Sequence, residues 1–168
     1  MSDPCKNLPE AIRSDQTVAV LAVSPFDEDH STLKGIFRQT RWAIHGVRAF
    51  EEARDFLRHE LPAVVVCERF LPDGSWHDLF RLTSALNEPP QLIVTAGDAD
   101  DSLWAEVLNL GGYDVLAKPF ERSEVTRIIS LAWLHWKESR LTRSADETGR
   151  KRAGCEERPL AATVTAGL

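Results

Sequence analysis

Residues 63–67 read Ala-Val-Val-Val-Cys and form the clearest strand pattern in the chain. The run is continuously apolar, follows Pro62 and ends at the charged pair Glu68-Arg69, as is typical of a strand buried on both faces of a sheet. Shorter apolar runs occur at residues 18–23, 42–47, 91–95 and 113–116. The sequence therefore predicts five strands, of which this one is the third.

Stretches of helical length separate these strands and carry apolar residues at helical spacing. They cover residues 27–39, 50–61, 76–86, 98–110 and 121–138, while 71–75 has the composition of a turn. Strict alternation of strand and helix favours parallel strands with right-handed crossovers and helices on both faces. We predict a single α/β domain with a doubly wound, five-stranded parallel sheet, and a functional crevice at the carboxyl ends of its strands.

The composition fits one such domain. The chain has 168 residues, of which 43% are apolar and 27% charged, enough for one core with tails. We expect the domain at residues 17–138, an N-terminal tail at 1–16 and a disordered C-terminal tail at 139–168, since neither tail shows apolar periodicity. The net charge of −6 argues against direct nucleic-acid binding, and the cluster Arg150-Lys151-Arg152 is interpreted as part of a solvated tail.

The sequence predicts a cytoplasmic protein without a disulfide framework. Its three cysteines, Cys5, Cys67 and Cys155, are an odd number and lack metal-binding spacing; Cys67 is interpreted as a core residue. The N-terminus has no signal-peptide pattern, and no apolar run approaches the ~18 residues that cross a bilayer. The histidines show no ligand spacing, so no metal site is expected from them.

Three motifs lie near the predicted crevice: Leu71-Pro-Asp-Gly74 after the third strand, Thr95-Ala96 at the end of the fourth, and Gly111-Gly-Tyr-Asp-Val-Leu-Ala-Lys-Pro-Phe120. With these motifs the stretch from Thr17 to Glu138 resembles the receiver domains of bacterial two-component response regulators. The resemblance implies a flavodoxin-like (βα)5 fold and a role in phosphorelay signal transduction rather than as an enzyme.

The resemblance also implies a set of chemical positions at the crevice. In a receiver, an aspartate at the end of the third strand accepts a phosphoryl group. The same aspartate and an acidic pair after the first strand hold a divalent cation. A hydroxyl and a lysine grip the phosphoryl oxygens. Thr95 and Lys118 fill these last two positions, but Glu68 occupies the acceptor position and Ser24-Pro25 replaces the acidic pair.

These departures predict weak or absent Mg²⁺ binding, because this cation prefers carboxylate oxygens in near-octahedral geometry. The extra methylene of Glu68 misplaces its oxygens for the transfer. Val115 occupies the position of the aromatic switch residue. We therefore expect a pseudo-receiver in which Glu68, paired with Lys118, stands in for part of the phosphoryl charge, and phosphorylation-independent protein binding is its mechanism.

Two other interpretations stay open at this point. Glu68 and Lys118 could form an ordinary buried ion pair that only holds the fold. Alternatively, Asp27, Glu28 or Asp29 could supply a cation site that makes Glu68 phosphorylatable, although acids at the start of a helix are more simply solvated. A nucleotide-binding module is disfavoured because residues 24–26 provide no glycine-rich loop.

The expected partners are proteins. The resemblance suggests a histidine kinase or an output protein, and a homodimer through the fourth helix, fifth strand and fifth helix, where Trp104 and Trp133 could lie. Residues 139–168 show no core pattern, so we expect a stand-alone receiver without an output domain.

Overall fold

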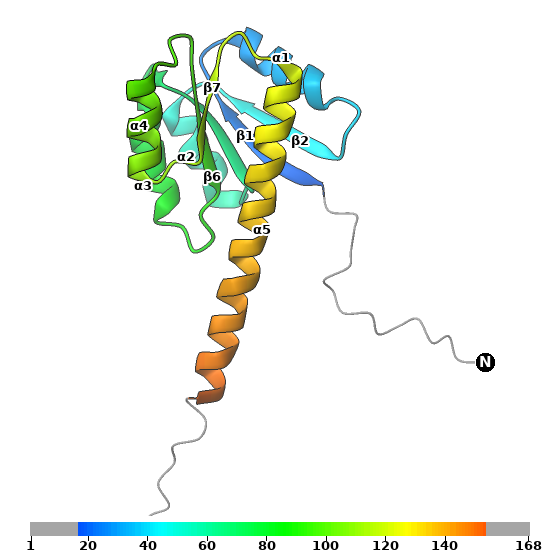
Figure 1. Cartoon of the computed structure of the whole chain (residues 1–168), viewed down its shortest axis with the longest axis vertical. Coiled ribbons are helices and arrows are strands. Elements are labelled where there is room, and N and C mark those ends of the chain that lie inside the picture. Colours follow the sequence, from blue (N-terminus) through cyan, green and yellow to red (C-terminus); the bar gives the residue numbers. More distant parts are fainter. Residues whose placement is uncertain (1–16, 154–168) are drawn as a thin grey trace, which may run out of the picture.

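The computed structural model describes residues 17–153, with side chains as far as Glu147. Its central sheet has five parallel strands in the order β2-β1-β3-β6-β7 (Figure 1). They are β1 (Val18–Val23), β2 (Trp42–Val47), β3 (Val64–Glu68), β6 (Gln91–Ala96) and β7 (Asp114–Ala117). The predicted doubly wound α/β fold is confirmed, and the five strands lie within a residue or two of their predicted ranges.

Five helices cover the two faces of the sheet (Figure 1). Helices α1 (Asp27–Phe37) and α5 (Arg122–Ala153) pack on one face, against side chains such as Val20 and Val64. Helices α2 (Phe50–His59), α3 (Trp76–Ser84) and α4 (Asp101–Leu110) pack on the other, against the alternate side chains Leu21 and Val65. Side chains of successive strand residues point to opposite faces, so the apolar runs of the sequence supply both layers of the core.

The order of the strands places the crevice. The chain runs from β1 outward to β2 and then returns to β3 on the other side of β1, so β1 and β3 flank the switch point. Ligands and partners of such sheets meet the carboxyl ends of the strands at this point. Ser24 follows β1 directly, and Glu68 is the last residue of β3.

The segment predicted as a turn at 71–75 is a small antiparallel hairpin, made of β4 (Phe70–Leu71) and β5 (Gly74–Ser75). Asp73 at its tip accepts hydrogen bonds from the backbone N–H groups of Phe50 and Glu51, at 2.7 and 3.0 Å. Because these donors are unpaired at the start of α2, the carboxylate fastens the hairpin to that helix.

Helix α5 ends later than the sequence predicts. The sequence predicts its end at about Glu138, but the helix continues through the first part of the predicted tail to Ala153. The rest of that tail, residues 154–168, and the predicted N-terminal tail 1–16 lie outside the described residues. Two arginines hold the extension against the α3–β6 loop: Arg140 forms an ion pair with Glu88 at 3.1 Å, and Arg143 donates to the carbonyl oxygen of Asn87 at 2.8 Å. The helix therefore projects beyond the sheet along a fixed direction (Figure 1).

The contact between Gly46 and His30 gives a stability prediction. A Cβ added at Gly46 would lie 2.6 Å from Nδ1 of His30, whose buried ring donates from Nε2 to the carbonyl oxygen of Ser24 at 2.8 Å. Gly46→Ala should therefore lower the free energy of unfolding by about 1–3 kcal/mol through overpacking. Gly35→Ala, on the exposed side of α1 with no atom within 4 Å, should raise it by up to ~1 kcal/mol. Urea unfolding of both variants checks this, and equal changes would contradict it.

Candidate functional site

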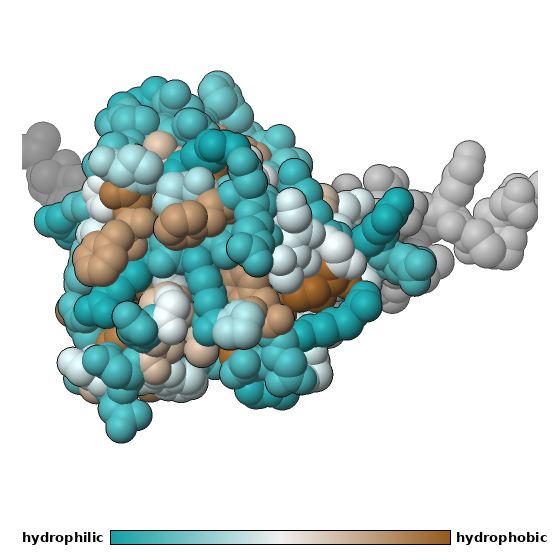
Figure 2. Space-filling model, turned by 90° about the horizontal axis from the view of Figure 1, so that it is seen from above, coloured by the Kyte–Doolittle hydropathy of each residue, from teal (hydrophilic) through white to brown (hydrophobic). Residues whose placement is uncertain are grey.

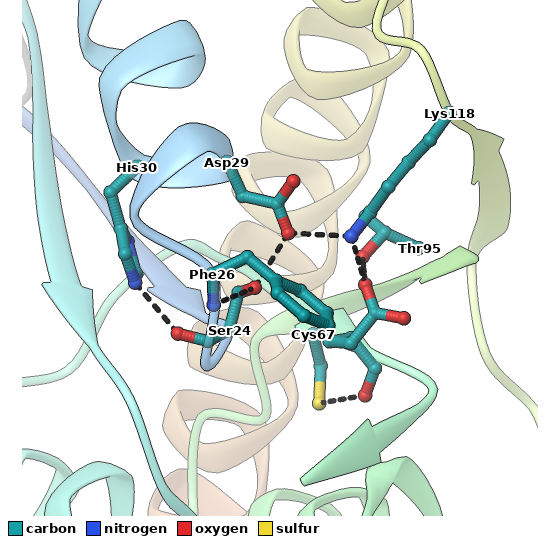
Figure 3. A network of polar contacts seen from close by, with 8 residues as sticks. Ser24, Phe26, Asp29, His30, Cys67, Thr95 and Lys118 are labelled. Atoms are coloured by element: carbon teal, nitrogen blue, oxygen red, sulfur yellow. Dashed lines mark hydrogen bonds and ion pairs between the residues drawn. The ribbon is translucent and has the colours of Figure 1, made fainter. Parts of the chain in front are cut away.

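Lys118, just after β7, is the centre of a polar network at the carboxyl ends of the strands. Its Nζ atom lies 2.5 Å from Oε2 of Glu68 and 2.6 Å from Oδ2 of Asp29. Figure 3 shows the lysine reaching across the crevice toward Asp29, with Thr95 beside its tip. One ammonium group thus bridges the end of β3 and the first turn of α1.

Two hydroxyl groups complete this network. Thr95 at the end of β6 donates from Oγ1 to Oε2 of Glu68 at 2.9 Å, and Ser24 donates from Oγ to Oδ2 of Asp29 at 2.5 Å. Each carboxylate therefore has one ammonium and one hydroxyl donor. Buried charges are stable only when they are paired and hydrogen-bonded in this way.

The network is largely shielded from solvent. The side chains of Lys118, Glu68 and Asp29 are 19%, 10% and 9% exposed. Burial by itself lowers the pKa of Lys118, but the hydrogen bonds and charges of Asp29 and Glu68 outweigh it, so that this pKa lies above its ordinary value of 10.5. Lys118 is accordingly a fixed cation at neutral pH.

Aromatic rings cover the outer side of the lysine. The centre of the Phe26 ring lies 4.7 Å from Nζ of Lys118, and the centre of the Phe120 ring lies 5.9 Å from the same atom. An ammonium group over the face of an aromatic ring is attracted by the negative face of the ring. The crevice therefore presents aromatic surface to the solvent above its charges.

Cys67 lies next to Glu68 in the chain but belongs to the core. Its side chain packs with the α2, α3 and α4 layer, and burial, with a smaller effect of the Glu68 charge, raises the pKa of its thiol far above the ordinary value. A thiol with a raised pKa is a poor nucleophile. The interpretation of Cys67 as a core residue is confirmed.

The comparisons with known proteins point to one family. No family model matches the chain. It is 32% identical over 91 residues to the transcriptional regulatory protein FixJ of Bradyrhizobium diazoefficiens, an alignment that covers 52% of this chain and 44% of FixJ. It is 25% identical over 115 residues to the two-component response regulator ORR11 of Oryza sativa, covering 66% of this chain and 78% of that protein. The chain thus spans less than half of FixJ.

The similar solved structures are receiver domains. The signal receiver domain of a LuxO repressor protein from Vibrio parahaemolyticus superposes with a TM-score of 0.71 at 20% identity, covering 76% of this chain and 98% of that domain. A CheY-like receiver domain protein from Methanospirillum hungatei gives 0.66 at 15% identity, covering 74% and 99%. The chain is similar to the receiver domains of response regulators and shares their fold.

The structure brings together three of the residues singled out by the sequence: Glu68, Thr95 and Lys118. The pairing of Glu68 with Lys118 is confirmed as a contact. Ser24 joins them only through Asp29, and the half-buried Pro25 has no oxygen in its side chain to offer a cation. Val115 is 1% exposed and packs in the core, so no aromatic ring occupies the switch position of the receiver.

The three acids at the start of α1 have different environments. Asp27 contacts Arg48 at the surface, and Glu28 is exposed. The interpretation of all three as solvated is wrong for Asp29, which is buried and bonded to Ser24 and Lys118. The reason is helical geometry: Asp29 lies on the buried face of α1 with Leu33, Ile36 and Phe37.

The sequence analysis also made expectations about metal binding, membrane spans and two tryptophans. Among residues 17–153 the chain has no cluster of three or more histidine, cysteine or acidic side chains that could hold a metal ion. No helix in this range is long and apolar enough to span a membrane. Trp133 packs edge-on against Trp42 at 5.7 Å and is half-buried, whereas Trp104 on α4 is 37% exposed.

Proposed function

We propose that this receiver domain takes part in two-component signalling by binding proteins without being phosphorylated. The observation that carries this proposal is the double ion pair of Lys118 with Glu68 and Asp29, at 2.5 and 2.6 Å. The lysine and the hydroxyl that would grip a phosphoryl group are both bonded to Glu68. Glu68 thereby provides a permanent negative charge at the acceptor position.

The chemistry of Glu68 supports the same conclusion. Its Oε2 atom accepts from Thr95 and pairs with Lys118, so the electron pairs of this oxygen are engaged by a hydroxyl proton and an ammonium group. Charge neutralisation by a divalent cation dominates such transfers. Ser24 and Pro25 supply no carboxylate for it, and one oxygen of Asp29, Oδ2, is already bonded to Lys118 and Ser24.

The alternative, a phosphorylatable Glu68 with a cation at Asp27, Glu28 or Asp29, finds less support. Asp27 is paired with Arg48 and Glu28 points into solvent, so neither contacts the crevice network. The third interpretation, an ion pair that only holds the fold, predicts the same contacts. It differs in expecting no protein partner at the crevice.

A second surface supports the proposed homodimer. The face formed by α4, β7 and α5 carries the exposed side chains Trp104 and Leu108 of α4, together with Leu131 of α5, at 37%, 50% and 45% exposure. Exposed apolar side chains that gather on one face are typical of protein interfaces. A partner kinase, an output protein or a second receiver would bury them.

The test is a phosphorylation experiment on the full chain. We expect no change of intact mass after incubation with Mg²⁺ and acetyl phosphate, while a receiver domain with an aspartate acceptor and an acidic pair after its first strand, treated in parallel, shows that the conditions support the transfer. A species heavier by about 80 Da, one phosphoryl group, and located at Glu68 would overturn the proposal.

A further inference from the structure

The face of the molecule at the carboxyl ends of the strands carries exposed aromatic side chains within a polar rim. Figure 2 looks onto this face and shows apolar side chains standing out between hydrophilic ones. Phe26 in the β1–α1 connection is 53% exposed, and Phe70 in the hairpin strand β4 is 67% exposed. Phe26 follows β1 and Phe70 follows β3, the two strands that flank the switch point.

Phe26 occupies a position where folding favours a different residue. It is the N-cap of α1 and makes no side-chain capping bond, whereas serine, threonine, aspartate and asparagine are preferred there because their oxygens accept a free helix N–H. Its ring lies over Lys118 with half of its surface in solvent. A residue that departs from a local rule without compensation in the fold often serves a function.

Phe70 forms the wall of a pocket beside Glu68. The pocket has a volume of about 150 Å³ and is lined by Glu68, Arg69, Phe70, Ala96, Gly97 and Asp98. The guanidinium group of Arg69 lies 5.1 Å from the centre of the Phe70 ring. The pocket is large enough for one side chain of a partner and offers an aromatic wall next to carboxylates.

The rim of this face is acidic. Its exposed carboxylates outnumber its cations: Lys118 is neutralised inside the crevice and Arg48 is paired with Asp27. The remaining cations are Arg69, which lies against Phe70, and Arg122, which donates to the carbonyl oxygen of Ile36. Apart from the paired Asp27, the exposed acids are Glu28, Asp73, Asp98, Asp100 and Asp101. A partner that covers the phenylalanines must therefore place its charged groups next to carboxylates, and opposite charges at the rim favour binding.

We propose that this face binds a segment of a partner protein in which apolar side chains stand between lysine or arginine side chains. The apolar side chains cover Phe26 and Phe70, one of them or a basic side chain enters the pocket beside Glu68, and the cations meet the acidic rim. This inference rests on the proposed function, because it names the chemistry of the protein that the unphosphorylated crevice binds.

The test is a selection from random 16-residue peptides displayed on phage, with the full chain as bait. We expect the selected peptides to combine aromatic or large aliphatic residues with lysine or arginine, and to bind more weakly as the salt concentration rises. The double variant Phe26→Ser/Phe70→Ser should bind them at least tenfold more weakly. The matched control Leu61→Ser/Leu110→Ser removes side chains of 51% and 49% exposure elsewhere and should bind them unchanged.

Stability separates a binding role of Phe26 from a structural one. The variant Phe26→Ser gains a capping hydroxyl and should melt at the same or a higher temperature while it loses peptide binding. Acidic or uncharged selected peptides, equal binding by the two double variants, or a self-association of the chain that Phe26→Ser/Phe70→Ser abolishes would each overturn the inference. Phosphorylation of Glu68 would instead overturn the proposed function, and it is measured by mass in a separate experiment.

Discussion

Replacement of Lys118 by methionine should lower the free energy of unfolding by about 3 kcal/mol or more. Methionine keeps most of the length of the side chain but removes the ammonium group from between Glu68 and Asp29, which are 10% and 9% exposed in their side chains. Two buried carboxylates then share the crevice without a cation, and they must either repel each other or take up protons. Urea unfolding followed by tryptophan fluorescence measures the loss.

An exposed ion pair provides the control. Arg58 and Asp55 on α2 are 61% and 66% exposed in their side chains, so Arg58→Ala should change the stability by less than about 1 kcal/mol. Adding Glu68→Leu to Lys118→Met removes one of the stranded charges and should restore part of the stability. If Lys118→Met were no more destabilising than Arg58→Ala, the network would not be the tightly coupled site described above.

The ion pair of Glu68 with Lys118 could be predicted from the sequence, whereas the ion pair of Asp29 with Lys118 was missed. Parallel strands bring their carboxyl ends to one edge of the sheet, so Glu68 at the end of β3 and Lys118 just after β7 both lie at that edge. A carboxylate in the first turn of a helix, in contrast, is usually solvated. The missed signal was its spacing: Asp29 precedes Leu33, Ile36 and Phe37 by 4, 7 and 8 positions, which places it on the apolar stripe of α1.

The end of α5 could not be predicted for a different reason. Beyond Trp136 the helix no longer packs on the sheet, so the apolar spacing that reveals a helix disappears. Its extension is instead held by Arg140 and Arg143 against Glu88 and Asn87. These contacts join residues more than 50 positions apart in the chain, so the local sequence of neither segment predicts them.

The second large effect that we expect is a gain of phosphorylation in the triple variant Ser24→Asp/Pro25→Asp/Glu68→Asp. The shorter side chain at position 68 withdraws its carboxylate from Lys118 by about one bond length, and the two new aspartates after β1 supply oxygens for Mg²⁺. Lys118, which stays paired with Asp29, and Thr95 then no longer bond the acceptor carboxylate and can bind the phosphoryl group. Intact mass after incubation with Mg²⁺ and acetyl phosphate should show a species heavier by about 80 Da.

The single variant Glu68→Asp separates the effect of the longer acceptor side chain from the effect of the missing acidic pair. It restores the acceptor but leaves Ser24 and Pro25 in place, so the cation still lacks its carboxylates and the mass should stay unchanged. Should Glu68→Asp alone become phosphorylated, the acidic pair would be dispensable and only the length of Glu68 would block the transfer. If the triple variant folds and binds Mg²⁺ but remains unmodified, the ion pair of Asp29 with Lys118 would be what prevents the transfer. Adding Asp29→Asn to the triple variant should then allow phosphorylation.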